Sequence, residues 1–151
     1  MNLRFIKSSE KKRIVEKLNE QFDIEKLPYL LIESGKEKIR AFSGSLSKEE
    51  IILIAQLTNI EAIGIYLIKR EKENDLRFSF DAVHLLKNQI KKNIIEINDS
   101  QLHDWLKGQD LSMQAEKGNV IIKFKEDFIG SGKSNGERIF NYVPKERRLK
   151  K

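Results

Sequence analysis

Apolar residues near the N-terminus recur at the spacing of a helix. Four of them share one helix face: Ile14, Val15, Leu18 and Phe22. Ser8 or Ser9 stands where an N-cap is preferred, so the pattern predicts a helix from there to about residue 22. Pro28 is incompatible with a continuing helix, and we expect the chain to form strands after it.

Short runs of alternating apolar and polar residues predict three strands in the rest of the first half. They cover residues 29–32, 38–43 and 62–68, and a turn at residues 34–36 joins the first two. Ser47 and Glu50 have the spacing of a capping box, and they precede an apolar run over residues 51–57. We therefore expect a short helix between the second and third strands.

The second half begins with mixed elements and ends as a sheet. We expect a strand over residues 76–80, a helix over 81–90 and a strand over 94–97. Asn98 or Asp99 can cap a helix that ends at Lys107, with Gly108 at its C′ position. The pattern is wholly β after that, with strands at 119–125, 128–133 and 137–143 and a hairpin turn at residues 134–136.

Residues 69–75 form the one uninterrupted polar stretch in the body of the chain. We place a domain boundary there, which gives domains over residues 1–75 and 76–151. The stretch is short and lacks Pro and Gly, so the two domains are expected to pack together. The predicted fold class is α+β, in which the second domain is a small mixed β-barrel with helices at its edge.

Composition narrows the chemistry. The chain of 151 residues has no cysteine and two histidines, which excludes disulfides and thiolate sites and gives a zinc site no clustered ligands. The longest apolar-rich run is far shorter than the roughly 20 residues of a membrane-spanning helix, and no signal-peptide pattern opens the chain. We expect a cytoplasmic protein without a membrane partner, a metal or another cofactor.

Positive charge is concentrated near the C-terminus. Residues 1–75 hold 14 Lys and Arg against 13 Asp and Glu, whereas residues 76–151 hold 15 against 10. Seven bases and two acids lie in residues 130–151, so nearly all the excess charge is there. Such an edge is typical of phosphate contacts, and a solvated lysine-rich tail is the alternative.

The sequence contains partial matches to catalytic patterns, but none of them has the residues or the spacing that catalysis requires. Residues 130–134 (Gly-Ser-Gly-Lys-Ser) resemble a phosphate loop, but Asp127 occupies the place of its first glycine and a hairpin follows where a helix is needed. His84 and His103 each lie in a predicted helix without a nucleophile or second histidine at helical spacing. Trp105 shares a helix face with Leu102 and Leu106, which favours core packing. We therefore expect no enzyme.

The segment from Gly130 to Arg148 carries the strongest functional signal. Two glycines within a predicted strand are usually tolerated where another backbone approaches closely. Five bases alternate with the aromatic residues Phe140 and Tyr142: Lys133, Arg138, Lys145, Arg147 and Arg148. Such a mixture can supply phosphate contacts together with a stacking surface, and Pro144 stiffens the chain ahead of the last three bases.

This segment resembles the end of a PUA-type RNA-binding domain. Ile129-Gly130-Ser131-Gly132-Lys133 and Asn141-Tyr142-Val143-Pro144-Lys145-Glu146-Arg147-Arg148 are similar to the C-terminal PUA-like domain of Sun-family RNA 5-methylcytosine methyltransferases. Over the whole chain, the size and order of elements resemble ribosome-assembly factors built from a pre-PUA and a PUA domain. The resemblance implies a pre-PUA-like domain followed by a PUA-like domain.

The resemblance also implies RNA binding in rRNA or tRNA maturation, without a methyl-donor site. The expected partners are structured RNA and an RNA methyltransferase or pre-ribosomal proteins. The predicted RNA-binding residues are Lys133, Arg138, Asn141, Tyr142, Lys145, Arg147 and Arg148, of which Asn141 has a structural role as its alternative. Two rival hypotheses remain open: a protein-interaction adaptor for an RNA-modifying enzyme without a direct RNA role, and an RNA-modifying enzyme whose site the sequence does not reveal.

Overall fold

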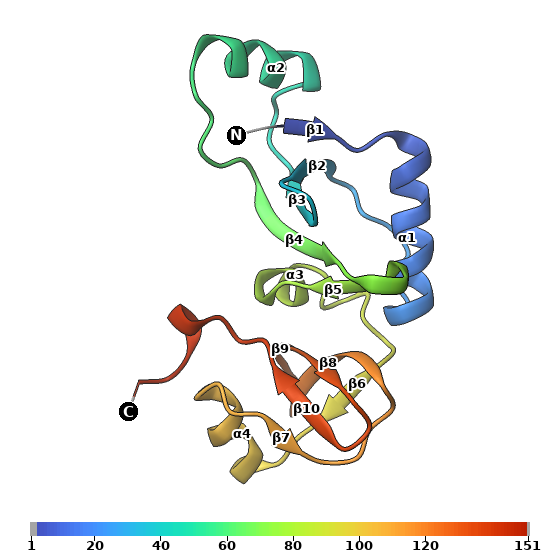
Figure 1. The fold of residues 1–151 in the computed structure, drawn as a ribbon, viewed down its shortest axis with the longest axis vertical. Helices are drawn as coiled ribbons and strands as arrows, with labels where there is room; N and C mark the ends of the chain where they lie inside the picture. The colour runs from blue at the N-terminus through green and yellow to red at the C-terminus, as the bar shows by residue number, and fades with distance from the viewer. Residues whose placement is uncertain (1–2, 151) are drawn as a thin grey trace.

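The computed structural model describes residues 3–150 and consists of two five-stranded sheets with helices around them. Figure 1 shows the two sheets one above the other along the long axis, with the short helix α3 (Phe80–Leu85) between them. This arrangement confirms the predicted α+β fold class.

The upper sheet is antiparallel throughout, in the order β1-β2-β3-β4-β5. Its strands are β1 (Leu3–Phe5), β2 (Leu30–Ser34), β3 (Lys38–Phe42), β4 (Ile65–Arg70) and β5 (Leu76–Phe78). Helix α1 (Ser8–Phe22) covers one face, where Phe22 stacks on Phe78 with ring centroids 4.8 Å apart. The predicted Ser8 or Ser9 cap is wrong, because the N-cap is Lys7 and no side chain accepts a hydrogen bond there.

The lower sheet has the order β6-β8-β9-β10-β7. Its strands are β6 (Ile94–Glu96), β7 (Leu111–Ser112), β8 (Gly118–Phe124), β9 (Asp127–Ser134) and β10 (Arg138–Asn141). Only β6 and β8 pair in parallel, and helix α4 (Asp99–Leu106) lies between β6 and β7 in the chain. Asn98 caps α4 in a capping box with Gln101, as the sequence predicts.

Buried contacts join the two halves. Ile121 of β8 is fully buried in the same core as α1 and the upper sheet. The hydroxyl of Ser131 donates to the carbonyl of Phe78 at 2.9 Å, and Asn119 donates to the carbonyl of Leu76 at 3.2 Å. β5 belongs to the upper sheet, so the sheets divide after β5, and the domain boundary at residue 75 stays a prediction.

Two segments differ from the expected pattern. The predicted ten-residue helix over 81–90 is replaced by the six-residue α3 and turns, and the polar stretch 69–75 contains the end of β4 and a 3-10 turn, η1 (Lys72–Asn74). Helix α2 (Lys48–Leu57) is longer than expected, and its N-cap is Ser47, whose hydroxyl accepts from the amide of Glu50 at 3.1 Å. Figure 1 shows α2 standing away from the sheets at the far end of the molecule.

Candidate nucleic-acid interface

The glycines of β9 allow the lower sheet to close around Trp105. A Cβ atom on Gly132 would lie 2.6 Å from the carbonyl oxygen of Phe140 and 2.9 Å from the Trp105 ring. The Trp105 ring is fully buried, and its Nε1 donates to the carbonyl of Ile129 at 2.8 Å. The predictions of a close backbone approach at this strand and of a core role for Trp105 are confirmed.

Two of the seven predicted RNA-binding residues make structural contacts on the Trp105 side of the sheet. The Asn141 amide donates to the carbonyls of Trp105 at 2.8 Å and Gln109 at 3.0 Å. The Arg148 Nε donates to the carbonyl of Val143 at 2.9 Å. A Cβ atom on Gly108 would lie 2.3 Å from that same Nε, so Arg148 packs directly on the end of α4. Asn141 therefore has the structural role that was its alternative, and Arg148 is turned toward the protein.

Lys133 of β9 and Phe140 of β10 are paired across the two strands, and their side chains lie on the side of the sheet away from Trp105. Phe140 is exposed, and the Lys133 ammonium lies 3.3 Å from the Glu71 carboxylate. Arg138 is also exposed, with Asp110 at 3.9 Å as its ion-pair partner. The outer side of the lower sheet therefore presents two bases and one aromatic ring.

Tyr142 continues this outer side to the junction between the halves. The Arg77 guanidinium lies over the Tyr142 ring, 4.1 Å from its centroid. Lys145 and Arg147 follow in the 3-10 turn η2 (Lys145–Arg147). The Arg147 guanidinium is 3.1 Å from Asp81 and 5.4 Å from the Phe80 ring centroid, so it too is held at the junction.

The upper sheet contributes four bases that the sequence analysis did not select. Lys38 pairs with Lys69 across β3 and β4, and Lys69 pairs with Arg77 across β4 and β5. Directly paired residues point to the same face of a sheet, so these three bases form a row on the face opposite α1. Arg40 lies two residues along β3 from Lys38, and the alternation with buried Ile39 was the signal that could have revealed it.

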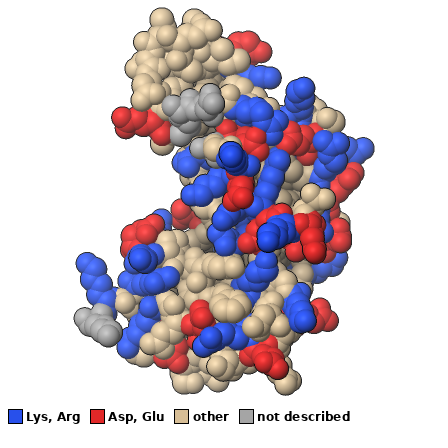
Figure 2. All heavy atoms as spheres, viewed as in Figure 1, with Lys and Arg blue, Asp and Glu red and all other residues tan. Residues whose placement is uncertain are grey.

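We call the combined surface the junction face. It consists of Lys38, Arg40, Tyr66, Lys69, Arg77, Lys133, Arg138, Phe140, Tyr142, Lys145 and Arg147. Figure 2 shows Lys and Arg side chains above and below a hollow at the junction of the two halves. The bases of this surface therefore come from both halves, although most of the net charge of +6 lies in residues 76–151.

A cleft of about 370 Å³ lies within the junction face. Its walls come from the β3–β4 region, the β5–α3 connection and the C-terminal segment: Arg40, Gly64, Tyr66, Arg77, Phe80, Asp81, Tyr142, Pro144, Glu146 and Arg147 among others. Asp81 and Glu146 make the rim partly acidic. The cleft thus combines guanidinium groups and aromatic rings with two carboxylates.

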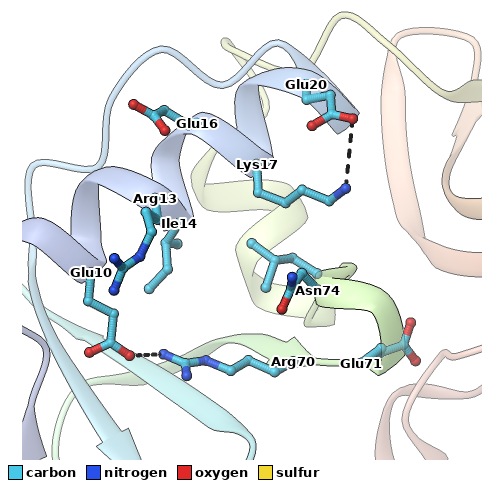
Figure 3. Close-up of a pocket in the computed structure, with 10 residues that line it drawn as sticks. Glu10, Arg13, Ile14, Glu16, Lys17, Glu20, Arg70, Glu71 and Asn74 are labelled. Carbon is cyan, nitrogen blue, oxygen red and sulfur yellow. Dashed lines mark hydrogen bonds and ion pairs between the residues drawn. The ribbon is translucent and has the colours of Figure 1, made fainter.

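A larger pocket of about 530 Å³ lies on the other face, between α1 and the β4–η1 connection. Figure 3 shows acids and bases interleaved there, with Glu10 joined to Arg70 and Glu20 to Lys17. Hydrogen bonds from Arg4 and Arg70 lower the pKa of Glu10 to about 2, so its carboxylate stays ionised. Because acids compensate the bases, this pocket lacks the charge excess that a polyanion requires.

Residues 3–150 contain no group of three or more His, Cys, Asp or Glu side chains placed to hold a metal ion. Within the same range, no helix has the length and apolar character needed to cross a membrane.

Comparisons with known proteins agree with the geometry of the lower half. A model of the methyltransferase RsmF PUA domain matches residues 92–149. Ribosomal RNA small subunit methyltransferase F of Vibrio parahaemolyticus is 25% identical over 151 residues, covering 94% of this chain and 30% of the relative. The protein of the same name from Aliivibrio fischeri is 32% identical over 85 residues, covering 56% of this chain and 18% of the relative.

This chain therefore spans less than a third of the length of these two relatives. The match is to their PUA domain and not to a catalytic methyltransferase domain, which agrees with the expectation that these 151 residues are not an enzyme. The lower half, residues 92–149, is a PUA-like domain similar to that of the RsmF methyltransferases.

Proposed function

We propose that this chain binds structured rRNA through the junction face and acts in ribosome assembly or RNA modification, with tRNA as the alternative RNA. One observation carries the proposal: bases from both sheets lie on one side of the molecule, and the Arg77–Tyr142 contact joins them. Such a surface fits recognition by phosphate and shape, which is how proteins read folded RNA.

The proposed contact residues follow the exposure of the side chains. Lys133, Arg138, Tyr142, Lys145 and Arg147 are retained from the sequence prediction, and Lys38, Arg40, Lys69 and Arg77 are added. Asn141 and Arg148 are excluded from the contact residues, because their side chains donate hydrogen bonds to the backbone carbonyls of Trp105, Gln109 and Val143. The site needs no cofactor, since binding uses charge, hydrogen bonds and stacking alone.

The test is a binding titration with a folded fragment of small-subunit rRNA at two salt concentrations. Lys38→Glu/Lys145→Glu reverses one base in each half. Lys12→Glu/Lys26→Glu is the matched control, because Lys12 lies on α1 behind the upper sheet and Lys26 follows that helix. We expect about tenfold or greater loss of affinity in the first variant and a shallower salt dependence, because two phosphate contacts are lost. Equal losses in both variants would show only an effect of net charge.

A protein-interaction role is the second candidate, and helix α2 favours it. Only Ile51 of α2 is buried, whereas Ile52, Leu53, Ile54 and Leu57 are exposed, Leu57 by 77%. Figure 2 shows a knob at this end of the molecule whose outer part carries no charged side chains, with charged side chains at its base. Glu49 and Glu50 in the first turn of α2, with Glu61 after it, outweigh the single base Lys48, so RNA is a poor occupant.

For this second candidate the proposed occupant is an RNA methyltransferase with an apolar groove and a basic rim, which complements the acids beside α2. The measurement is sedimentation velocity of this chain mixed with the full-length Vibrio parahaemolyticus relative. A complex that Leu53→Ser/Leu57→Ser abolishes, with Lys12→Glu unchanged, supports the adaptor role. The absence of a complex argues against it.

A further inference from the structure

Two hydrogen bonds to the backbone hold the side chain of Arg40, one of the bases of the junction face. Its Nε donates to the carbonyl of Ile63 at 2.7 Å, and its Nη2 donates to the carbonyl of Gly64 at 2.9 Å. Gly64 is itself constrained: its φ is +63°, and a Cβ atom there would lie 2.2 Å from the carbonyl oxygen of Ala41. Strand β3 therefore carries Arg40 and also packs, through Ala41, against the Ile63–Gly64 backbone that orients the guanidinium.

The charge of Arg40 has no acidic partner. Both of its protein hydrogen bonds go to carbonyl groups, and no carboxylate in residues 3–150 forms an ion pair with it. A guanidinium carries five N–H donors, so the remaining donors can meet an anion. A pre-oriented guanidinium of this kind suits a phosphate group, which accepts two parallel hydrogen bonds.

The other walls of the cleft are aromatic. Tyr66, Phe80 and Tyr142 line the cleft together with Arg40. Arg77 already covers one face of Tyr142, and neither tyrosine hydroxyl has a hydrogen-bond partner within residues 3–150. These walls therefore offer ring surfaces together with two hydroxyl groups that can donate or accept.

Size and charge together limit what fits. A volume of about 370 Å³ is near the lower end of small-ligand pockets, so a duplex cannot enter and a single nucleotide can. Glu146 repels a continuous track of phosphates, whereas the charge of Asp81 is paired with Arg147. Both carboxylates can accept hydrogen bonds from the amino and imino groups of a base. One phosphate near Arg40 and one base toward the rim satisfy both conditions.

We infer that the cleft binds a single unpaired nucleotide of the RNA, with its phosphate on Arg40 and its base between the aromatic walls. This inference rests on the proposed RNA-binding function and adds the recognised feature. Proteins that read RNA sequence or shape commonly accept unstacked bases on aromatic rings and arginine planes. The rest of the junction face then contacts the paired stem on either side through phosphates.

The experiment compares two RNA hairpins with the same stem, one fully paired and one with a single bulged uridine. The full chain is titrated with each as wild type, Arg40→Gln, Tyr142→Phe and the control Lys12→Gln. We expect wild type to prefer the bulged hairpin, and Arg40→Gln to lose about tenfold or more affinity for it, since a charged hydrogen-bond donor is removed. The paired hairpin and the control variant should change little.

Two further measurements keep the test independent of folding. Thermal unfolding identifies any variant that is misfolded, and Tyr142→Phe retains the ring, so its effect isolates the hydroxyl. A 4-thiouridine at the bulge should crosslink to peptides that contain Tyr66 or Tyr142. Equal affinity of wild type for both hairpins, without these crosslinks, overturns the inference and leaves RNA binding intact. No binding to either hairpin or to the rRNA fragment overturns the proposed function, and the inference with it.

Discussion

The Lys133 ammonium lies 3.3 Å from the Glu71 carboxylate, and this contact ties β9 to the connection that leaves β4. The same carboxylate accepts a hydrogen bond from Asn119 at 2.9 Å and lies 3.7 Å from the Arg77 guanidinium. Glu71 is only 14% exposed. It therefore fixes two bases of the junction face and partly neutralises them at the same time.

Replacing Glu71 by Gln separates these two effects. The neutral amide can still accept from Asn119, but the ion pairs to Lys133 and Arg77 are lost and the two bases repel each other. We expect the free energy of unfolding to fall by about 1–2 kcal/mol, because the pairs are partly buried. RNA affinity should rise several-fold at low salt, because both bases become available to phosphates. Chemical denaturation and RNA titration measure the two quantities.

Glu126→Gln is the matched control, because it removes the same charge from a residue that is exposed in the β8–β9 turn. It should change neither stability nor RNA affinity by more than a small amount. Weaker or unchanged RNA binding in Glu71→Gln would show that Lys133 and Arg77 serve only to hold the halves together.

Two features of the structure require glycine at position 108: its left-handed backbone conformation and the side chain of Arg148 beside it. Its φ is +88°, and a Cβ atom would meet the Nε and Cδ of Arg148. We expect Gly108→Ala to destabilise the protein by about 2 kcal/mol or more, from left-handed strain and the clash together. Gly35→Ala is the control, because its φ is +73° and nothing lies within 4 Å of the added atom, so it carries the strain alone.

The double variant Gly108→Ala/Arg148→Ala tests the clash directly. If Arg148 packs on Gly108, the two substitutions are non-additive and the double variant recovers part of the lost stability, as neighbouring sites do. Strict additivity in thermal denaturation would contradict the packing. The same cycle decides whether Arg148 is structural, because the single variant Arg148→Ala should then lower stability and leave RNA affinity nearly unchanged.

Local signals explain what the sequence could predict. The Asn98 cap, the C′ position of Gly108 and the hairpin at residues 134–136 all depend on neighbours within a few residues, and each appears in the structure as expected. Strands β1 and β7 were missed because they have three and two residues and exist only through pairing with distant strands. No periodicity is detectable over so short a run.

The residues of the candidate site were harder to predict than these local elements, because contacts between distant parts of the chain decide which side chains are exposed. Arg148 and Lys145 are close in sequence and both basic, yet Arg148 binds the carbonyl of Val143 whereas Lys145 is exposed. Arg77 joined the site only because β5 brings it to Tyr142, 65 positions later in the chain. Charge along the sequence therefore located one edge of the surface, and the direction of each side chain came from tertiary packing.

Trp105 provides a test of how the two halves unfold. It is the single tryptophan and lies in the core of the lower half, so its fluorescence reports that core alone. Ile121 of the lower sheet is buried in the upper core, and we expect the fluorescence and far-UV circular dichroism transitions to coincide in urea. Ser131→Ala, which leaves the Phe78 carbonyl without its partner, should lower the free energy of unfolding by about 1–2 kcal/mol and shift both urea midpoints down together. Two separated transitions would show independent domains.

The ion pairs of Glu10 should make the free energy of unfolding depend on pH below about pH 5. The Arg4 guanidinium donates to both carboxylate oxygens at 3.0 Å, and with Arg70 it holds the pKa of Glu10 at about 2, below its ordinary value of 4.5. The unfolded chain therefore binds a proton at higher pH than the folded protein, so this stabilisation is complete above about pH 5 and lost as the pH falls toward 2. After screening by water, we expect about 1–2 kcal/mol.

The measurement is urea denaturation of wild type and Glu10→Gln between pH 7 and pH 2.5. Other carboxylates titrate over the same range, so the difference between the two proteins is the informative quantity. Wild type should be more stable at pH 7, and the difference should shrink as the pH falls, because Glu10 becomes protonated and resembles the amide. Glu16→Gln is the control, as Glu16 is exposed on α1 and should show no such convergence. A difference that stays constant with pH would mean that Glu10 contributes packing and not charge.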